Sequence, residues 1–265
     1  MGMKYNRIRK ILNENGTSVA TRMWSTNPFF TEILGDYKFD YVEYLAEYSP
    51  FTQTDLQNIC RAAELNEMGS MIKVDFQNRG YVAQKAAASG FQAILFTDHR
   101  TPDDVYESIR MIKPETPEAG GIFGYPNNRF IGGQSAISQL EHAKRCSDIV
   151  LCFMIEKKSA VENIEEICRI KGVDMVQFGP SDYSMSCGKN MADYKDECKA
   201  AERKMIETAL ANGVQPRCEI YSADQAKYYA DLGVRHFCVG DQIKILKEFW
   251  KKQGDQMAEF CSRLI

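Results

Sequence analysis

Residues 149–188 read IVLCFMIEKKSAVENIEEICRIKGVDMVQFGPSDYSMSCG, and this stretch decides the fold class. It opens with an unbroken apolar run at 149–155, continues with a helical pattern at 160–170, and returns to a mostly apolar run at 175–179. Strands that are apolar throughout are typical of a parallel sheet covered on both faces, with a helix as the crossover. The stretch therefore predicts one strand–helix–strand unit of an α/β protein.

The same alternation repeats along the rest of the chain. Eight strand candidates in 265 residues favour a closed (β/α)₈ TIM barrel over an open sheet, and we expect one domain over 1–265. No GxGxxG or GxxxxGKS/T motif is present, which argues against a nucleotide-binding fold. The predicted strands are 17–23, 39–45, 70–75, 93–97, 149–155, 175–179, 215–220 and 236–240. The predicted helices are 56–66, 80–89, 102–112, 135–146, 160–170, 195–212 and 223–232.

Composition excludes several classes of function. With 33 basic and 36 acidic residues the net charge is -3, so no nucleic-acid partner is expected. No apolar run approaches the length of about 18 residues that spans a bilayer, so no membrane partner is expected. The nine cysteines form no CxxC pair, which argues against a common zinc site, and unpaired thiols in this number indicate the reducing cytoplasm.

Two carboxylates stand where the quoted apolar strands end. Glu156 follows the first strand and Asp182 follows the second, and strand ends of a barrel meet at one face. Two neighbouring buried carboxylates repel each other unless a cation lies between them, and Mg²⁺ or Mn²⁺ prefers such oxygen ligands. The alternative is that both residues are helix-capping acids, and the spacing alone leaves this alternative open.

Other strand ends supply further polar candidates. The side chains with potential chemistry there are Arg22, Tyr48, Lys73, Asp98 and His99. Arg22 could bind an anionic group of a substrate or form a surface salt bridge, whereas Lys73 lies in a strand that should be buried. His99 and Tyr48 are candidate proton carriers, but a loop histidine and a core tyrosine explain them equally well.

The segment 154–188 resembles the signature of the metal-dependent, class II 2-oxoacid aldolases of the HpcH/HpaI family. The resemblance lies in Ile155-Glu156, in the 160–167 stretch AVENIEEI, and in Gly179-Pro180-Ser181-Asp182. It implies that Glu156 and Asp182 bind a divalent metal, Mg²⁺ or Mn²⁺ with Co²⁺ as a further option. It also implies that the backbone around Gly179, Pro180 and Ser181 binds the carboxylate of a small 2-oxoacid substrate, whose enolate the metal stabilises.

The sequence departs from this family at the residues that handle protons. Where the family has an Asp–His pair after the second strand, this chain has Leu45 and Tyr48. The family arginine of the third strand is replaced by Lys73, which keeps the charge but loses the bidentate fork. The chain is therefore either a pseudoenzyme or an enzyme in which Tyr48 or His99, with Asp98, has taken over the proton transfer.

Three functions remain open from the sequence. The first is a carbon–carbon lyase that releases pyruvate or a related 2-oxoacid from a 4-hydroxy-2-oxoacid. The second is a citrate-lyase-like or decarboxylating enzyme, and the third is a non-catalytic 2-oxoacid-binding module. The amphipathic segment 243–265 either packs on its own barrel or forms a subunit interface, and the resemblance implies a homo-oligomer, a hexamer built as a trimer of dimers.

Overall fold

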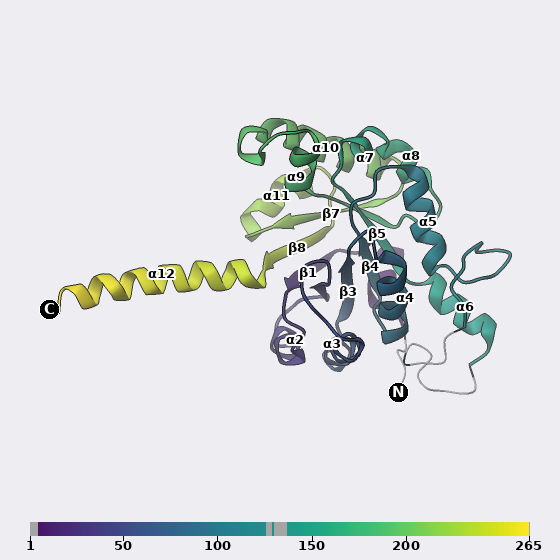
Figure 1. The fold of residues 1–265 in the computed structure, drawn as a ribbon, viewed down its shortest axis with the longest axis horizontal. Helices are drawn as coiled ribbons and strands as arrows, with labels where there is room; N and C mark the ends of the chain where they lie inside the picture. Colours follow the sequence, from purple (N-terminus) through teal and green to yellow (C-terminus); the bar gives the residue numbers. More distant parts are fainter. Residues whose placement is uncertain (1–4, 126–128, 130–136, 265) are drawn as a thin grey trace.

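The strands close into a parallel barrel. The structure, a computed structural model, describes residues 5–125, 129 and 137–264. Its strands pair in the order β1 to β8, and β8 returns to pair with β1 (Figure 1). This confirms the predicted (β/α)₈ fold, and the predicted strands agree with the observed ones to within two residues at each end. The strands are β1 Ser18–Met23, β2 Tyr41–Leu45, β3 Gly69–Val74, β4 Ala93–Phe96, β5 Val150–Ile155, β6 Met175–Phe178, β7 Gln215–Ile220 and β8 His236–Asp241.

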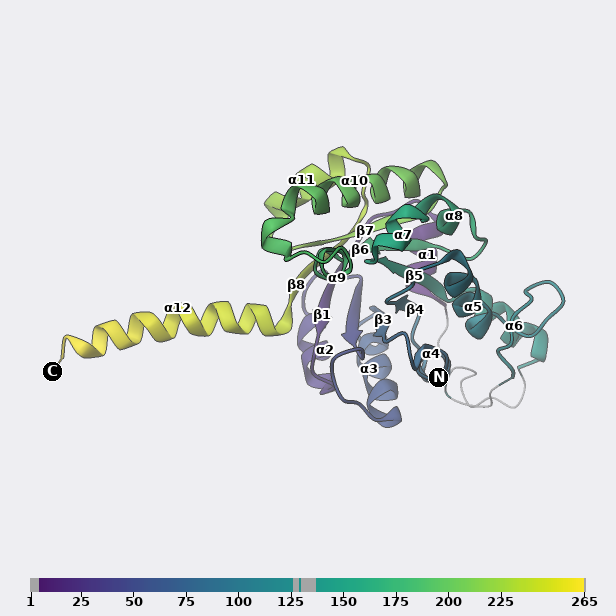
Figure 2. The ribbon, with the colours of Figure 1, turned by 45° about the horizontal axis from the view of Figure 1, so that its top comes forward.

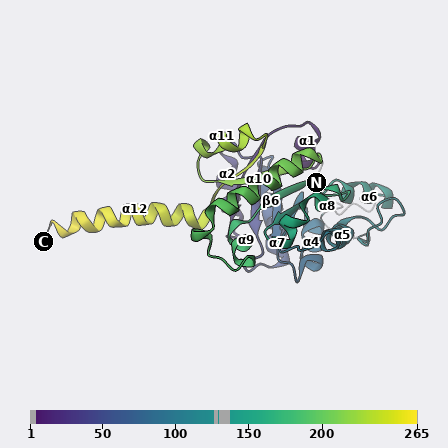
Figure 3. The ribbon, with the colours of Figure 1, turned by 90° about the horizontal axis from the view of Figure 1, so that it is seen from above.

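Helices surround the barrel, as Figures 2 and 3 show from two further directions. The predicted helix 160–170 is divided at Asn163 into two helices, and the first two residues of the predicted helix 135–146 lie outside the described residues. Two short helices that begin at a proline, α2 and α9, were not predicted. The helices are α1 Arg7–Asn13, α2 Pro28–Gly35, α3 Gln53–Leu65, α4 Arg79–Ser89, α5 Pro102–Ile112, α6 Gln139–Ser147, α7 Lys158–Glu162, α8 Ile164–Arg169, α9 Pro180–Ser186, the 3₁₀ helix η2 Met191–Asp193, α10 Lys195–Ala211, α11 Ala223–Asp231 and α12 Gln242–Ser262.

The barrel interior changes character along its axis. Near the amino ends of the strands it is filled by apolar side chains such as Met71, Leu95 and Met175, against which Ile8 of α1 packs. Further along the strands the inward positions carry charges, including Glu43, Arg217 and Lys73. The apolar packing closes one end of the barrel, so any site that depends on these charges lies toward the carboxyl ends of the strands.

The last helix, α12, leaves the barrel altogether. It extends away from the other helices in all three views and carries the C-terminus at its far end (Figures 1, 2 and 3). It contains no buried residue, and Phe249 and Trp250 are each more than 60% exposed. The helix therefore does not pack on its own barrel.

Among the described residues, no helix combines the length and apolarity that crossing a membrane requires.

Candidate functional site

Glu156 is a buried carboxylate at the end of β5. Its side chain is 2% exposed, and Oε1 accepts a hydrogen bond from the backbone N–H of Asp98 at 2.8 Å. Asp98 has φ +61°, a left-handed conformation that is uncommon outside glycine and is kept only where the surroundings enforce it. The loop after β4 is therefore shaped so that one N–H points at Glu156.

Gly179 makes room for the same carboxylate on the neighbouring strand. Ile155 pairs with Phe178, so Glu156 and Gly179 leave β5 and β6 side by side. A Cβ atom on Gly179 would lie 2.6 Å from Oε2 of Glu156, which is closer than real side chains approach. Pro180 then begins α9, with Ser181 exposed and Asp182 partly exposed in its first turn. The four residues that the sequence analysis grouped here do lie together.

Lys157, which the sequence analysis did not single out, connects the acids of this site. Its Nζ lies 2.5 Å from Oδ1 of Asp98 and 3.1 Å from Oδ1 of Asp182. Two adjacent lysines in the sequence gave no signal to separate this one from Lys158, which is exposed. Lys157 thus joins Asp98 and Asp182, and Asp98 in turn holds Glu156 through its backbone N–H.

Lys73 on β3 supplies a second ammonium group near Glu156. Its Nζ lies 2.6 Å from Oε2 of Glu47 and donates a hydrogen bond to the hydroxyl of Tyr48 at 2.8 Å. Burial opposes its charge, but the carboxylates of Glu156 and Glu47 outweigh burial and raise the pKa of Lys73 above its ordinary value. Lys73 is therefore a permanent, nearly buried cation beside the Glu156 site.

Tyr48 is half exposed at the rim, and its ring stacks on Trp24 at a centroid distance of 5.4 Å. Burial of the hydroxyl end raises the pKa of Tyr48 to about 12, although Lys73 opposes this shift. The phenol is consequently protonated near neutral pH. A tyrosine that donates protons efficiently would need a lowered pKa, so the expectation of a lowered pKa for Tyr48 is wrong and its phenol is a weak acid.

The electrostatics of the site suit a divalent cation. Burial raises the pKa of Glu156 to about 7, the nearby Asp182 and Asp98 add to the rise, and Lys73 and the Asp98 N–H oppose it. Four carboxylates, those of Glu47, Asp98, Glu156 and Asp182, face the two ammonium groups of Lys73 and Lys157, which leaves two negative charges when all are ionised. Among the described residues no three His, Cys, Asp or Glu side chains form a metal site. Two carboxylates with open positions for a chelating substrate are, however, what Mg²⁺ ordinarily accepts.

Arg22 points into the barrel and is already neutralised. Its Nη1 lies 2.6 Å from Oε2 of Glu219, and its Nε lies 3.8 Å from Oδ2 of Asp241, which also accepts a hydrogen bond from Nε1 of Trp24. The surface salt bridge considered for Arg22 is therefore corrected to a mostly buried one. With two acids beside it, Arg22 is poorly placed to bind a free substrate carboxylate.

Deeper in the barrel lies an ion pair that the sequence analysis missed. Arg217 and Glu43 are both 0% exposed and form an ion pair, while Arg217 also donates hydrogen bonds to Gln177 and to the hydroxyl of Tyr41. The available signal was a charged residue at an inward position of each apolar strand. Their pairing could not be seen in the sequence, because the two partners are 174 positions apart.

His99 lies apart from this cluster. Its imidazole is fully buried against Phe76, Phe96 and Phe153, with its two nitrogens hydrogen-bonded to the Thr97 carbonyl and the Ser108 hydroxyl. Burial lowers the pKa of His99 to about 4, so the ring is neutral at physiological pH. Of the two candidate proton carriers, the structure places Tyr48 at the rim and His99 among packed aromatic rings.

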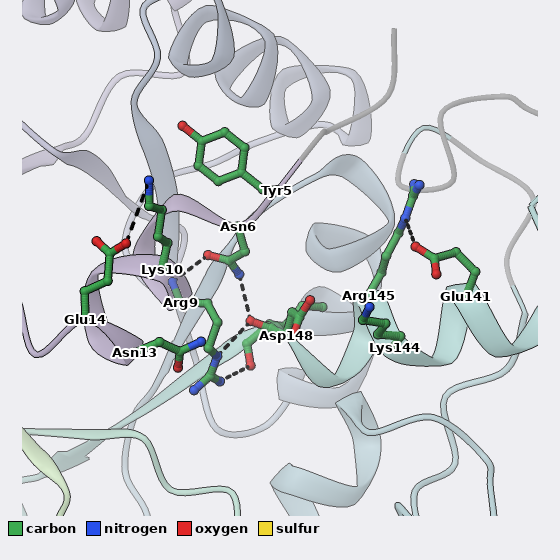
Figure 4. A pocket seen from close by; sticks show the side chains of 11 residues that line it. Tyr5, Asn6, Arg9, Lys10, Asn13, Glu14, Glu141, Lys144, Arg145 and Asp148 are labelled. Carbon is green, nitrogen blue, oxygen red and sulfur yellow. Dashed lines mark hydrogen bonds and ion pairs between the residues drawn. The ribbon is translucent and has the colours of Figure 1, made fainter.

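A hollow of about 620 Å³ lies at the opposite end of the barrel, between α1 and α6 (Figure 4). Its charged side chains largely pair with one another: Lys10 with Glu14, and Arg145 with Glu141. Arg9 donates hydrogen bonds to the backbone and forms an ion pair with Asp174. The charges of this hollow are thus mostly used within the fold, unlike the cluster around Glu156.

A parallel barrel with charged side chains at the carboxyl ends of its strands is the architecture of barrel enzymes. The sequence profile described as HpcH/HpaI aldolase/citrate lyase matches residues 23–237, and the chain belongs to this family. A hydroxypyruvate/pyruvate aldolase of Roseobacter denitrificans is 25% identical over 245 residues, which cover 91% of this chain and 93% of the relative.

Two solved structures show the same fold. An HpcH/HpaI aldolase from Desulfitobacterium hafniense superposes with a TM-score of 0.84 at 19% identity, covering 95% of this chain and 96% of the other. The citrate synthase SbnG superposes with a TM-score of 0.83 at 18% identity, covering 96% of this chain and 98% of the other. Family membership makes an aldolase-type lyase the general class of this protein.

Proposed function

We propose that the protein is a metal-dependent carbon–carbon lyase that cleaves a 4-hydroxy-2-oxoacid into pyruvate, or a related 2-oxoacid, and an aldehyde. The observation that carries the proposal is the buried Glu156 carboxylate. It lies close to Asp182 and Lys73 and has no ion-pair partner within 4 Å among the described residues. Burying an unpaired carboxylate is unfavourable, so its retention at a strand end indicates a ligand that pairs with it.

Glu156 and Asp182 are the proposed ligands of Mg²⁺ or Mn²⁺, with Co²⁺ as a further option. When bound, such a cation polarises the oxo group and stabilises negative charge on the enolate. Gly179, Pro180 and Ser181 form the proposed floor for the substrate carboxylate. Lys73 adds a fixed positive charge near Glu156, and charges that are fixed before the reaction stabilise the developing enolate most effectively.

Tyr48 is the proposed proton donor. Its hydroxyl is protonated near neutral pH, contacts Lys73 and lies at the half-exposed rim, where a substrate can reach it. Asp98 is proposed to act on Glu156 and Lys157 and not on the substrate. For His99 the packing favours a structural role, since both ring nitrogens already have partners.

The proposal is tested by incubating the purified protein with a 4-hydroxy-2-oxoacid and coupling pyruvate release to lactate dehydrogenase. Release that requires Mg²⁺ or Mn²⁺ and stops with a chelator supports the lyase. Metal binding without release from any of several 4-hydroxy-2-oxoacids would contradict it and favour a 2-oxoacid-binding module.

A citrate-lyase-like or decarboxylating enzyme is the second candidate. It is favoured by Leu45, which is 1% exposed and contributes no acid where the family aldolases have one. Loss of carbon dioxide from an enolate-forming acid needs no base to deprotonate an aldol hydroxyl. Decarboxylation of oxaloacetate in the absence of any aldol cleavage would support this candidate over the first.

We also propose that the protein is a homo-oligomer, with a hexamer as the expected form, held together through α12. The exposed apolar residues of that helix include Ile245, Phe249, Trp250, Met257 and Phe260. A stripe of this size on a helix with no buried residue is unfavourable in water unless another subunit covers it. A monomeric mass in light scattering, unchanged when residues 243–265 are removed, would contradict this assembly.

All nine cysteines are free thiols, which fits a reducing compartment such as the cytoplasm.

A further inference from the structure

Lys157 occupies a position that bears directly on metal binding. It follows Glu156 in the chain, and its side chain is 12% exposed. Its Nζ donates a hydrogen bond to Oδ1 of Asp182 at 3.1 Å. An oxygen atom of one proposed metal ligand is thus already paired with a cation that belongs to the protein.

Asp98 gives this lysine a second partner. Its Oδ1 lies 2.5 Å from Nζ of Lys157, while its backbone N–H is bonded to Glu156. The left-handed backbone of Asp98 costs roughly 1–3 kcal/mol in general, and such strain persists where the surroundings over-determine it. One residue therefore fixes both the carboxylate of Glu156 and the ammonium group of Lys157.

We propose that Lys157 is an internal counter-ion that competes with the divalent metal for Asp182, and that Asp98 retains Lys157 when the metal binds. This inference rests on the proposed function, because it takes Glu156 and Asp182 as the metal ligands. In the metal-free protein the ammonium group relieves repulsion between Asp98 and Asp182. The same contact lowers the affinity of the site for the metal, since Asp182 exchanges one cation for another.

The neighbouring lysine offers a matched control. Lys158 carries the same charge one residue further on, but its side chain is 63% exposed and faces Glu162 at 3.9 Å. Removing it tests the general effect of one fewer positive charge near the site, without touching Asp182. A difference between the two lysine variants therefore reports the direct pairing.

The experiment measures Mn²⁺ binding to the full-length protein without substrate, from the electron paramagnetic resonance signal of free Mn²⁺. Lys157→Gln is expected to bind Mn²⁺ roughly tenfold more tightly than the wild type, because a contact at about 3 Å in a partly buried site is worth at least that factor. Lys158→Gln is expected to stay within about twofold of the wild type, as screened surface charges do.

Asp98→Asn is expected to change affinity in the opposite direction, to roughly tenfold weaker, because Lys157 then turns fully to Asp182. Its control is Asp103→Asn, which removes an exposed acid nearby on α5. Circular dichroism of each variant checks that the fold is kept. If Lys157→Gln does not fold, Lys157→Met takes its place: tighter Mn²⁺ binding than in the wild type supports the proposal, and unchanged binding overturns it.

Equal Mn²⁺ affinities for Lys157→Gln, Lys158→Gln and the wild type would overturn the inference while leaving the proposed function standing. If neither the wild type nor Lys157→Gln binds Mn²⁺, the metal site itself fails, and the proposed function fails with it. Because the measurement reports metal affinity alone, it separates these two failures without any assay of turnover.

Discussion

Two buried glutamates on the inner face of this barrel have opposite surroundings. Glu43 on β2 is paired with Arg217, and both side chains are completely inaccessible to solvent. Glu156 after β5 is almost as buried, but among the described residues its recorded hydrogen-bond donor is one backbone N–H. Glu43 thus has its counter-ion within the fold, whereas burial raises the pKa of Glu156 to about 7. Burial alone therefore does not identify a functional acid, whereas burial without a direct ion-pair partner does.

The largest expected effect comes from making the same substitution at both glutamates and comparing the stability of the two variants. Glu43→Gln leaves the guanidinium of Arg217 buried without its carboxylate, and we expect the free energy of unfolding to fall by about 3 kcal/mol. Glu156→Gln removes a carboxylate that is unfavourable when charged, and we expect stability at pH 8 without metal to rise by roughly 1–3 kcal/mol. Urea unfolding followed by circular dichroism measures both changes, and losses of equal size would refute the distinction.

Lys73→Met should lower the rate of pyruvate release by about a hundredfold, because a fixed charge beside a developing enolate contributes on that scale. Mn²⁺ should still bind, since Lys73 is not a ligand and its removal reduces local positive charge. A matched control is Lys85→Met on the exposed face of α4, which should leave the rate unchanged. Full activity in Lys73→Met would remove this residue from the proposed site.

Tyr48→Phe and His99→Phe separate the two candidate proton carriers. We expect Tyr48→Phe to slow turnover by roughly tenfold to a hundredfold, the usual range for losing one proton donor. His99→Phe should preserve turnover and lower the unfolding free energy by about 1–3 kcal/mol, because it removes the buried hydrogen bonds of the ring with the Thr97 carbonyl and the Ser108 hydroxyl. Steady-state kinetics and urea unfolding distinguish the outcomes. Turnover that persists when both residues are phenylalanine would exclude both as proton carriers.

The pH dependence of stability gives a smaller but diagnostic effect. The folded-state pKa of Glu156, about 7, lies above the ordinary value of 4.5, so the folded protein binds the extra proton between these values. Stability of the metal-free protein should therefore fall as pH rises from about 4.5 to 7. Glu156→Gln should lose this part of the slope, which urea titrations at several pH values will show. An unchanged slope in the variant would mean that Glu156 is not the group responsible.

How far the sequence predicts this molecule depends on the range of the interaction. The strands were predicted from short, mostly apolar runs, and Glu156 and Asp182 were found because they lie just after two of these runs. Helix α2 was missed because it is only eight residues long and its cap and first residue, Asn27-Pro28, are also typical of a turn. The break of the predicted helix at Asn163 is likewise a local event that periodicity does not resolve.

The features that the sequence could not supply are contacts between distant residues. Arg217 and Glu43 are far apart in the chain, and their pairing requires the closed barrel. Lys157 pairs with Asp98 across 59 positions of the chain, and the left-handed backbone of Asp98 is likewise not predictable from its sequence neighbours. His99 looked like a loop residue by its polar neighbours, whereas packing against three phenylalanines decides its burial.

The central claim is that Glu156 is buried without a direct ion-pair partner because a metal completes its site. The most direct test is exchange of the methyl protons of pyruvate in deuterated buffer, followed by proton NMR with and without Mg²⁺ or Mn²⁺. We predict exchange that requires the metal and falls about a thousandfold or more in Glu156→Gln, since loss of metal activation is worth several kcal/mol. Exchange at the wild-type rate in that variant, or no exchange in the wild type with metal bound, would contradict the account.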